Sequence, residues 1–237
     1  MAGDGDWRDA LAHALGSLPR RGRLIILVHG YRFTWRTNGA GRAPHCPQDL
    51  LYATDAVAPP RGVWPSRAAW AHALMAGQGR DEGGRALCIG FGWDGRRGTL
   101  GHLLRRGRLD FGAVYDGAGT AGAALSTLLR TIAADRPDLK PCFFAHSLGA
   151  RVVLSAMRKA PELKLGRALL LGAAEFVDKA QSALIAQADA GGDAAIYHVL
   201  SRANDPFDAV FTRLAPRSAS VEPSLGLAGL SGARRPT

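Results

Sequence analysis

One stretch of the chain combines a nucleophilic side chain with backbone N–H groups that could assist its reaction. Residues 142–145 are apolar and predict a short strand, while the residues after Gly149 predict a helix with an apolar face. A serine in the tight turn between a strand and a helix projects above the carboxyl end of a sheet, and the unpaired N–H groups of the helix N-terminus point to the same spot. The stretch therefore predicts that Ser147 is a nucleophile and that the Leu148 amide forms half of an oxyanion hole.

The elements that must position this turn alternate between strands and helices. Besides residues 142–145, apolar runs predict buried strands at residues 23–30, 86–93, 167–172 and 196–200. Helical periodicity is expected at residues 6–18, 66–75, 110–134, from 150 to about 161, and 178–188. This alternation predicts an α/β domain whose mainly parallel sheet is flanked by helices on both faces.

The composition is that of one globular domain. Its 237 residues are 47% hydrophobic and 21% charged, which is enough for a single core, expected over about residues 23–214 of the domain 1–237. Residues 32–65 lack a periodic pattern and predict either a lid that contacts substrate or a surface insertion. Residues 216–237 are rich in small residues, Pro, Gly and Arg, and predict a flexible tail.

The charge and the cysteines exclude several classes of function. The net charge is +10, but the basic residues are scattered; the one cluster comprises Arg96, Arg97, Arg105, Arg106 and Arg108. A solvated surface is the commoner role of such a cluster, so we expect no nucleic-acid partner. The start is acidic, no apolar run is long enough to span a membrane, and the three cysteines form no metal-ligand pair. These features predict a cytoplasmic protein without a cofactor or a metal.

Three motifs, taken together, resemble a known family. Residues 145–149, Ala-His-Ser-Leu-Gly, resemble the nucleophile elbow of the α/β-hydrolase fold, with Ala in place of the first glycine of G-x-S-x-G. His29-Gly30, after the first buried strand, resembles the oxyanion loop of that fold, and Asp205 follows a later strand, where the family places its acid. With the Ser-Arg-x-Asn-Asp segment at residues 201–205, the chain is most similar to an uncharacterised bacterial esterase or lipase-like branch, over about residues 23–214.

The resemblance implies a serine hydrolase for a small carboxylic ester or related acyl substrate. Ser147 would form an acyl-enzyme, Asp205 would orient the imidazole of the general base, and the amides of Tyr31 and Leu148 would bind the oxyanion. The residues expected to support these groups are His29, Gly30, His146 and Gly149. Alternative acids are Asp208 and Glu175, the second of which follows the fourth predicted strand.

A catalytic histidine is missing from the place where the family carries it. No histidine follows His198, and no further strand is predicted there. The family pattern thus implies a reduced fold, without the first hairpin strands and the last strand, and a chain truncated before its catalytic histidine. Two alternatives stay open: a hydrolase-fold protein that binds without catalysis, and a hydrolase whose base is His198, His102 or His45. The oligomeric state is also left open.

Overall fold

The computed structural model describes residues 6–20, 22–34, 86–95, 100–216, 220 and 222–228, but not the side chains of residues 6, 100–110, 203 and 227. Most of the predicted loop or lid (32–65), the helix expected at 66–75, His45 and part of the arginine cluster lie outside the described residues.

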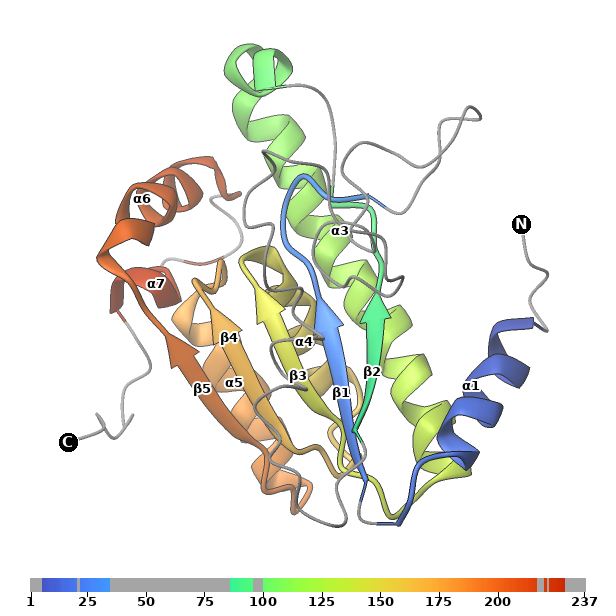
Figure 1. Ribbon diagram of the computed structural model, residues 1–237. Helices are drawn as coiled ribbons and strands as arrows, with labels where there is room; N and C mark the ends of the chain where they lie inside the picture. Colours follow the sequence, from blue (N-terminus) through green and yellow to red (C-terminus); the bar gives the residue numbers. More distant parts are fainter. Residues whose placement is uncertain are drawn as a thin grey trace.

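The centre of the structure is a five-stranded sheet in which every pairing is parallel (Figure 1). Its strands are β1 (Arg23–Val28), β2 (Ala86–Phe91), β3 (Cys142–His146), β4 (Arg167–Leu171) and β5 (Ala195–Val199), in the spatial order β2-β1-β3-β4-β5. Each strand coincides with a predicted apolar run. The α/β fold is confirmed.

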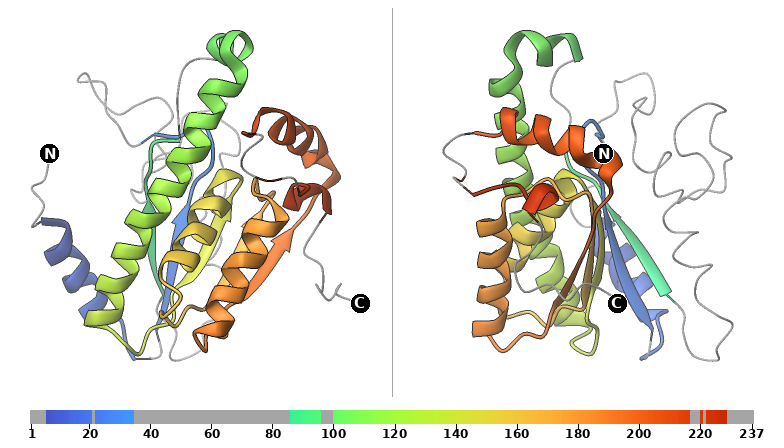
Figure 2. Two further views of the ribbon diagram at one scale, coloured as in Figure 1. Left: turned by 180° about the vertical axis from the view of Figure 1, so that it is seen from behind. Right: turned by 90° about the vertical axis from the view of Figure 1, so that its left-hand side faces the viewer.

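The helices in contact with the sheet lie together on one of its faces. They are α3 (Leu100–Asp135), α4 (Leu148–Lys159) and α5 (Val177–Asp189), with α4 packed between the other two (Figure 2). Helix α1 (Asp6–Gly16) lies beside the end of α3, where the Arg136 guanidinium donates hydrogen bonds to the carbonyl oxygens of Leu15 and Leu18 at 2.7 and 2.8 Å. Helices on the opposite face stay a prediction.

The C-terminal region differs from the prediction in two places. A short 3₁₀ turn (Arg202–Asn204) leads into helix α6 (Asp205–Leu214), where the sequence predicts only a connection. The flexible tail expected over 216–237 is wrong for residues 222–228, which hold helix α7 (Leu225–Ala228) and a β-bridge from Ser224 to Phe176. Leu225 is fully buried, so one apolar side chain anchors a helix of four residues, too short for periodicity to reveal.

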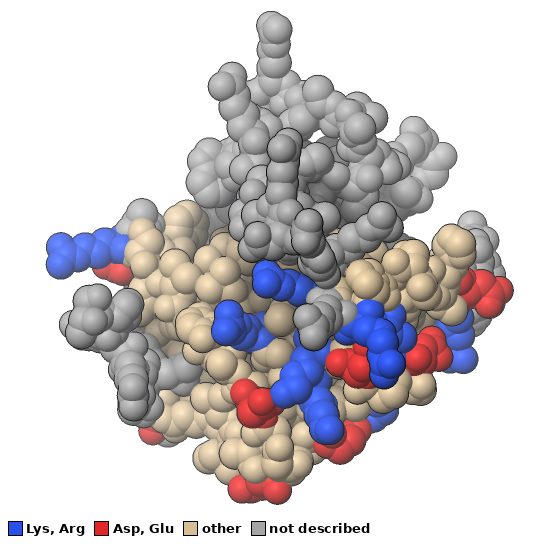
Figure 3. Space-filling model, turned by 60° about the horizontal axis from the view of Figure 1, so that its bottom comes forward, with Lys and Arg blue, Asp and Glu red and all other residues tan. Residues whose placement is uncertain are grey.

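The carboxyl ends of the strands lie at one end of the sheet, and a group of charged side chains lies at the other. Because all strands are parallel, their carboxyl ends meet at one edge, at the top in Figure 1. The opposite end carries basic side chains interspersed with acidic ones (Figure 3), including the ion pairs Arg136–Asp138 and Lys140–Asp193, both 2.8 Å. None of the described helices combines the length and apolar composition that a membrane crossing requires.

Candidate active site

The turn between β3 and α4 holds Ser147 in an unusual backbone conformation. Its φ of 53° and ψ of −124° lie where non-glycine residues are rare, because the Cβ atom crowds the backbone. Three hydrogen bonds fix the turn: the Ser147 amide donates to the Leu171 carbonyl at 3.0 Å, and the Ser147 carbonyl accepts from the amides of Ala150 and Ala174 at 3.0 and 3.1 Å. The predicted order of strand, sharp turn and helix is confirmed.

The tip of this turn carries a hydroxyl and an amide that have no hydrogen-bond partner among the described residues. Ser147 is partly exposed, and its hydroxyl forms no hydrogen bond with a described residue. Leu148 is the first residue of α4, so its amide has no partner within the helix, and it donates no hydrogen bond to the described part of the chain. A hydroxyl and an amide donor thus lie on adjacent residues.

The loop after β1 packs directly against this turn. A Cβ atom built on Gly30 would lie 2.8 Å from both the Ser147 Cβ and the His146 carbonyl oxygen, closer than such atoms can approach. A Cβ on Gly149 would lie 2.5 Å from the Val28 carbonyl oxygen. Both glycines are therefore needed for the close approach of the two backbones.

His29 fixes the shape of this loop. Its ring is fully buried, the Trp93 amide donates to its Nε2 at 3.1 Å, and its Nδ1 lies 3.0 Å from the Gly30 carbonyl oxygen. Since Nε2 accepts a hydrogen bond, the neutral ring carries its proton on Nδ1 and donates it to Gly30. The Trp93 indole stacks on the imidazole at 5.5 Å and donates from Nε1 to the His29 carbonyl oxygen at 2.8 Å.

The loop is also hydrogen-bonded to the segment after β2. The Arg32 amide donates to the Gly95 carbonyl at 2.8 Å, and the Gly95 amide donates to the Phe33 carbonyl at 3.0 Å. These bonds hold Arg32 at a φ of 76°, a conformation that only a constrained non-glycine residue adopts. The sequence did not reveal that the segment after β2 holds the loop after β1. Its only sign was Trp93, at the end of the second predicted strand.

Acid should destabilise the fold through His29. Burial lowers the pKa of His29 from 6.5 to about 4, so between these values the unfolded chain binds a proton that the folded chain does not. The contribution of neutral His29 to the free energy of unfolding is therefore fully present above pH 7, and it falls by up to about 3 kcal/mol as the pH drops toward 4.

Denaturant unfolding from pH 7 to pH 4.5 should give a shallower pH dependence of the unfolding free energy for His29→Gln than for wild type. His13→Gln, at an exposed position, should retain the wild-type slope; equal slopes in all three proteins would contradict this role of His29.

The other histidine that the sequence predicts as a supporting residue, His146, lies beside the loop after β1. His146 is partly buried, and burial lowers its pKa. A Cβ on Gly30 would lie 3.3 Å from His146 Nδ1, so the ring lies against the loop after β1. The ring is thus beside the loop that the sequence predicts it to support.

The predicted acid and its first alternative lie in different environments. Asp205 is exposed at the start of α6, and no described contact joins it to Ser147 or to a histidine. Asp208 is buried, accepts a hydrogen bond from Asn204 Nδ2 at 3.1 Å, and has its pKa raised by burial. The Asn204 side chain also lies against Gly172, just beyond β4.

The second alternative acid already has three hydrogen-bond donors. Glu175 is buried, and its carboxylate accepts hydrogen bonds from Tyr115, Arg151 and the Phe176 amide. It follows β4 as predicted, and none of these three donors is an imidazole.

The described residues do not supply a general base. His198 Nε2 accepts a hydrogen bond from the Ala173 amide at 3.3 Å, and its Nδ1 is buried without a partner. Its strand, β5, is separated from β3 by β4. The base alternative His198 is therefore not supported, whereas His45 and the side chain of His102 lie outside the described residues.

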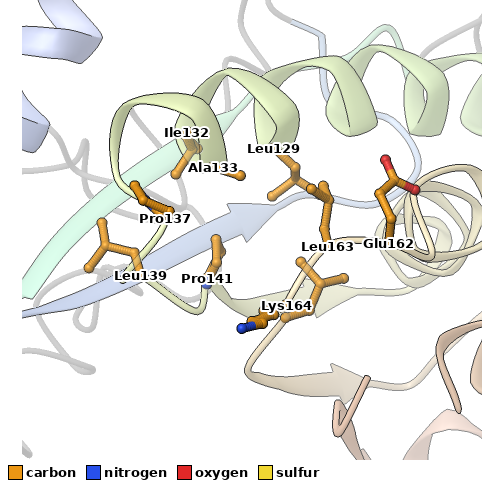
Figure 4. A pocket seen from close by; sticks show the side chains of 10 residues that line it. Leu129, Ile132, Ala133, Pro137, Leu139, Pro141, Glu162, Leu163 and Lys164 are labelled. Carbon is orange, nitrogen blue, oxygen red and sulfur yellow. The ribbon is translucent and has the colours of Figure 1, made fainter. Parts of the chain in front are cut away.

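Away from the Ser147 turn, the described residues hold a pocket but no metal-binding cluster. A cavity of about 200 Å³ lies between the C-terminal end of α3, the loop into β3 and the loop after α4 (Figure 4), at the end of the sheet opposite Ser147. Within the described ranges, no three His, Cys, Asp or Glu side chains gather as a metal site would require.

Comparisons with known proteins give no match: no family model, no curated protein and no solved structure is similar to this chain. We therefore infer the function from the geometry around Ser147.

Proposed function

We propose that this chain is a serine hydrolase that cleaves a small carboxylic ester or related acyl compound through an acyl-enzyme, as its resemblance to the α/β-hydrolase fold implies. The observation that carries the proposal is the strained Ser147, which stands between β3 and α4 with the Gly30 loop packed against it. We further expect a cytoplasmic bacterial enzyme without a nucleic-acid partner.

Each step of the proposed reaction has a group assigned to it. Ser147 Oγ attacks the carbonyl carbon while a base takes its proton, and the oxyanion binds the amides of Leu148 and Tyr31. The intermediate collapses, the alcohol leaves with the proton of the base, and a water molecule then hydrolyses the acyl-enzyme by the reverse sequence. No described residue is assigned as the base; Asp205, or the more buried Asp208, is proposed to orient the imidazole that serves as base.

A binding protein without catalysis is the second candidate. The observation that favours it is that no imidazole in the described ranges is hydrogen-bonded to Ser147. Such a protein would hold an acyl compound beside Ser147 without attacking it.

Reaction with a fluorophosphonate separates the two. We expect the 237-residue chain to gain one phosphonyl group, mapped to Ser147 by peptide mass spectrometry. Ser155, in the next turns of α4, is buried and serves as an internal control that should stay unmodified. An intact mass unchanged after prolonged incubation would favour the binding protein.

A further inference from the structure

The side chains of Tyr115, Arg151 and Glu175 form a largely buried, hydrogen-bonded cluster close to the Ser147 turn. The Tyr115 hydroxyl donates to Glu175 Oε1 at 2.6 Å, and Arg151 Nη1 donates to Glu175 Oε2 at 2.8 Å. Arg151 Nε also donates to the Tyr115 carbonyl oxygen at 2.7 Å, and the guanidinium lies 3.5 Å over the Tyr115 ring. Burial and the Glu175 charge raise the pKa of Tyr115, so the phenol keeps the proton that it donates.

The cluster joins three elements, two of which adjoin Ser147. Tyr115 comes from α3, Arg151 from the first turn of α4, and Glu175 from the segment between β4 and α5. The residue before Glu175, Ala174, donates its amide to the Ser147 carbonyl oxygen at 3.1 Å. Arg151 thus fixes helix α4, which follows Ser147. Glu175 fixes the segment after β4, whose Ala174 amide is hydrogen-bonded to the Ser147 carbonyl oxygen.

The backbone on the far side of Glu175 is fixed as well. Its own carbonyl oxygen accepts the Leu225 amide at 2.8 Å, and its Oε1 accepts the Phe176 amide at 2.9 Å. The segment that bears Ala174 is therefore constrained by its side chain and its main chain together.

Stability alone does not account for an ion pair in this place. The exposed fraction of the side chain is 2% for Glu175 and 15% for Arg151, and the desolvation of two such charges offsets much of their attraction. An apolar cluster of equal volume would stabilise the fold as well. The directional bonds of the ion pair instead fix the orientation of α4 relative to the end of β4, which an apolar contact would leave adjustable.

We propose that Arg151, Glu175 and Tyr115 form a clamp that holds Ser147 in its strained conformation, and that they are positioning residues for the attack of its hydroxyl. A strained backbone persists only where its surroundings over-determine it. When the clamp is released, Ser147 relaxes toward an ordinary φ, and its hydroxyl leaves the position beside the Leu148 amide. The inference rests on the proposed function, but its structural part can be tested without activity.

The test uses Glu175→Gln with Glu162→Gln as a matched control. Glu162 accepts a hydrogen bond from Arg130 of α3 at 2.8 Å, so it forms an ion pair between α3 and the end of α4, but an exposed one. Two quantities are measured well below the unfolding temperature: the fluorophosphonate rate, resolved into its maximal rate and its half-saturating concentration, and hydrogen exchange at the amides of Ser147 and Ala174.

Glu175→Gln should lower the maximal labelling rate by about 10- to 100-fold, the range expected when a strained residue is released, with the half-saturating concentration unchanged. Exchange at the Ser147 and Ala174 amides should accelerate by a similar factor, while Glu162→Gln changes neither quantity by more than about twofold. If Glu175→Gln fails to fold, Tyr115→Phe, which removes one hydroxyl, should show the same pattern with a smaller change.

Unchanged exchange at both amides in the clamp variants would overturn the inference. So would acceleration that merely follows the loss of global stability, measured by denaturant unfolding. A wild-type chain that is not labelled at all would instead count against the proposed function, while the exchange of the two amides would still decide whether the clamp exists.

Discussion

Alanine in place of Gly30 should slow the labelling of Ser147 by a fluorophosphonate about 100- to 1000-fold, the loss that follows removal of one oxyanion donor. The methyl group would lie 2.8 Å from the Ser147 Cβ and from a backbone oxygen of His146. Neither neighbour is the flexible end of a side chain, so the loop after β1 must move away and carry the Tyr31 amide with it. Second-order labelling rates at pH 7 measure the effect.

Gly117→Ala is the control for this prediction. Gly117 lies within α3, and a Cβ atom there would meet nothing within 4 Å. Its replacement should leave the labelling rate unchanged and stabilise the helix by up to about 1 kcal/mol. A Gly30→Ala protein that is labelled as fast as the Gly117→Ala protein would show that the loop after β1 takes no part in the reaction.

Two replacements of Ser147 should separate its chemistry from its strain. Ser147→Ala and Ser147→Gly should both abolish labelling, because neither carries a nucleophile. They should differ in stability by about 1 kcal/mol in favour of glycine, because glycine accepts a φ of 53° without the crowding that alanine suffers.

Urea unfolding of the two variants measures this difference. Both lack the hydroxyl, so their comparison isolates the backbone conformation at position 147. Alanine more stable than glycine would mean that the elbow is not strained in solution. Labelling that persists in either variant would place the reactive group elsewhere.

The sequence was sufficient for the parts of this site that depend on one continuous stretch. The apolar run at residues 142–145 determines β3, and the apolar face after Gly149 determines α4, so the turn at Ser147 follows from both. The same logic predicted the other four strands. Parallel strands then place the segment at His29 at the same edge of the sheet as Ser147.

The parts that depend on distant residues could not be predicted. The bond between Trp93 and His29 joins residues 64 apart, and the bond between Tyr115 and Glu175 joins residues 60 apart. No local pattern marks either pair. Glu175 was predicted as an alternative acid from its place after β4, but the cluster that occupies its carboxylate becomes visible only when α3 and α4 are packed together.

A crystal structure of the phosphonylated protein would show directly whether Ser147 reacts beside two backbone amides. We expect an adduct on Ser147 Oγ with φ still near +50°, and a phosphonyl oxygen about 2.7–3.1 Å from the amide nitrogens of both Leu148 and Tyr31. An adduct whose phosphonyl oxygen contacts neither amide, or one carried by a residue other than Ser147, would contradict the proposed function.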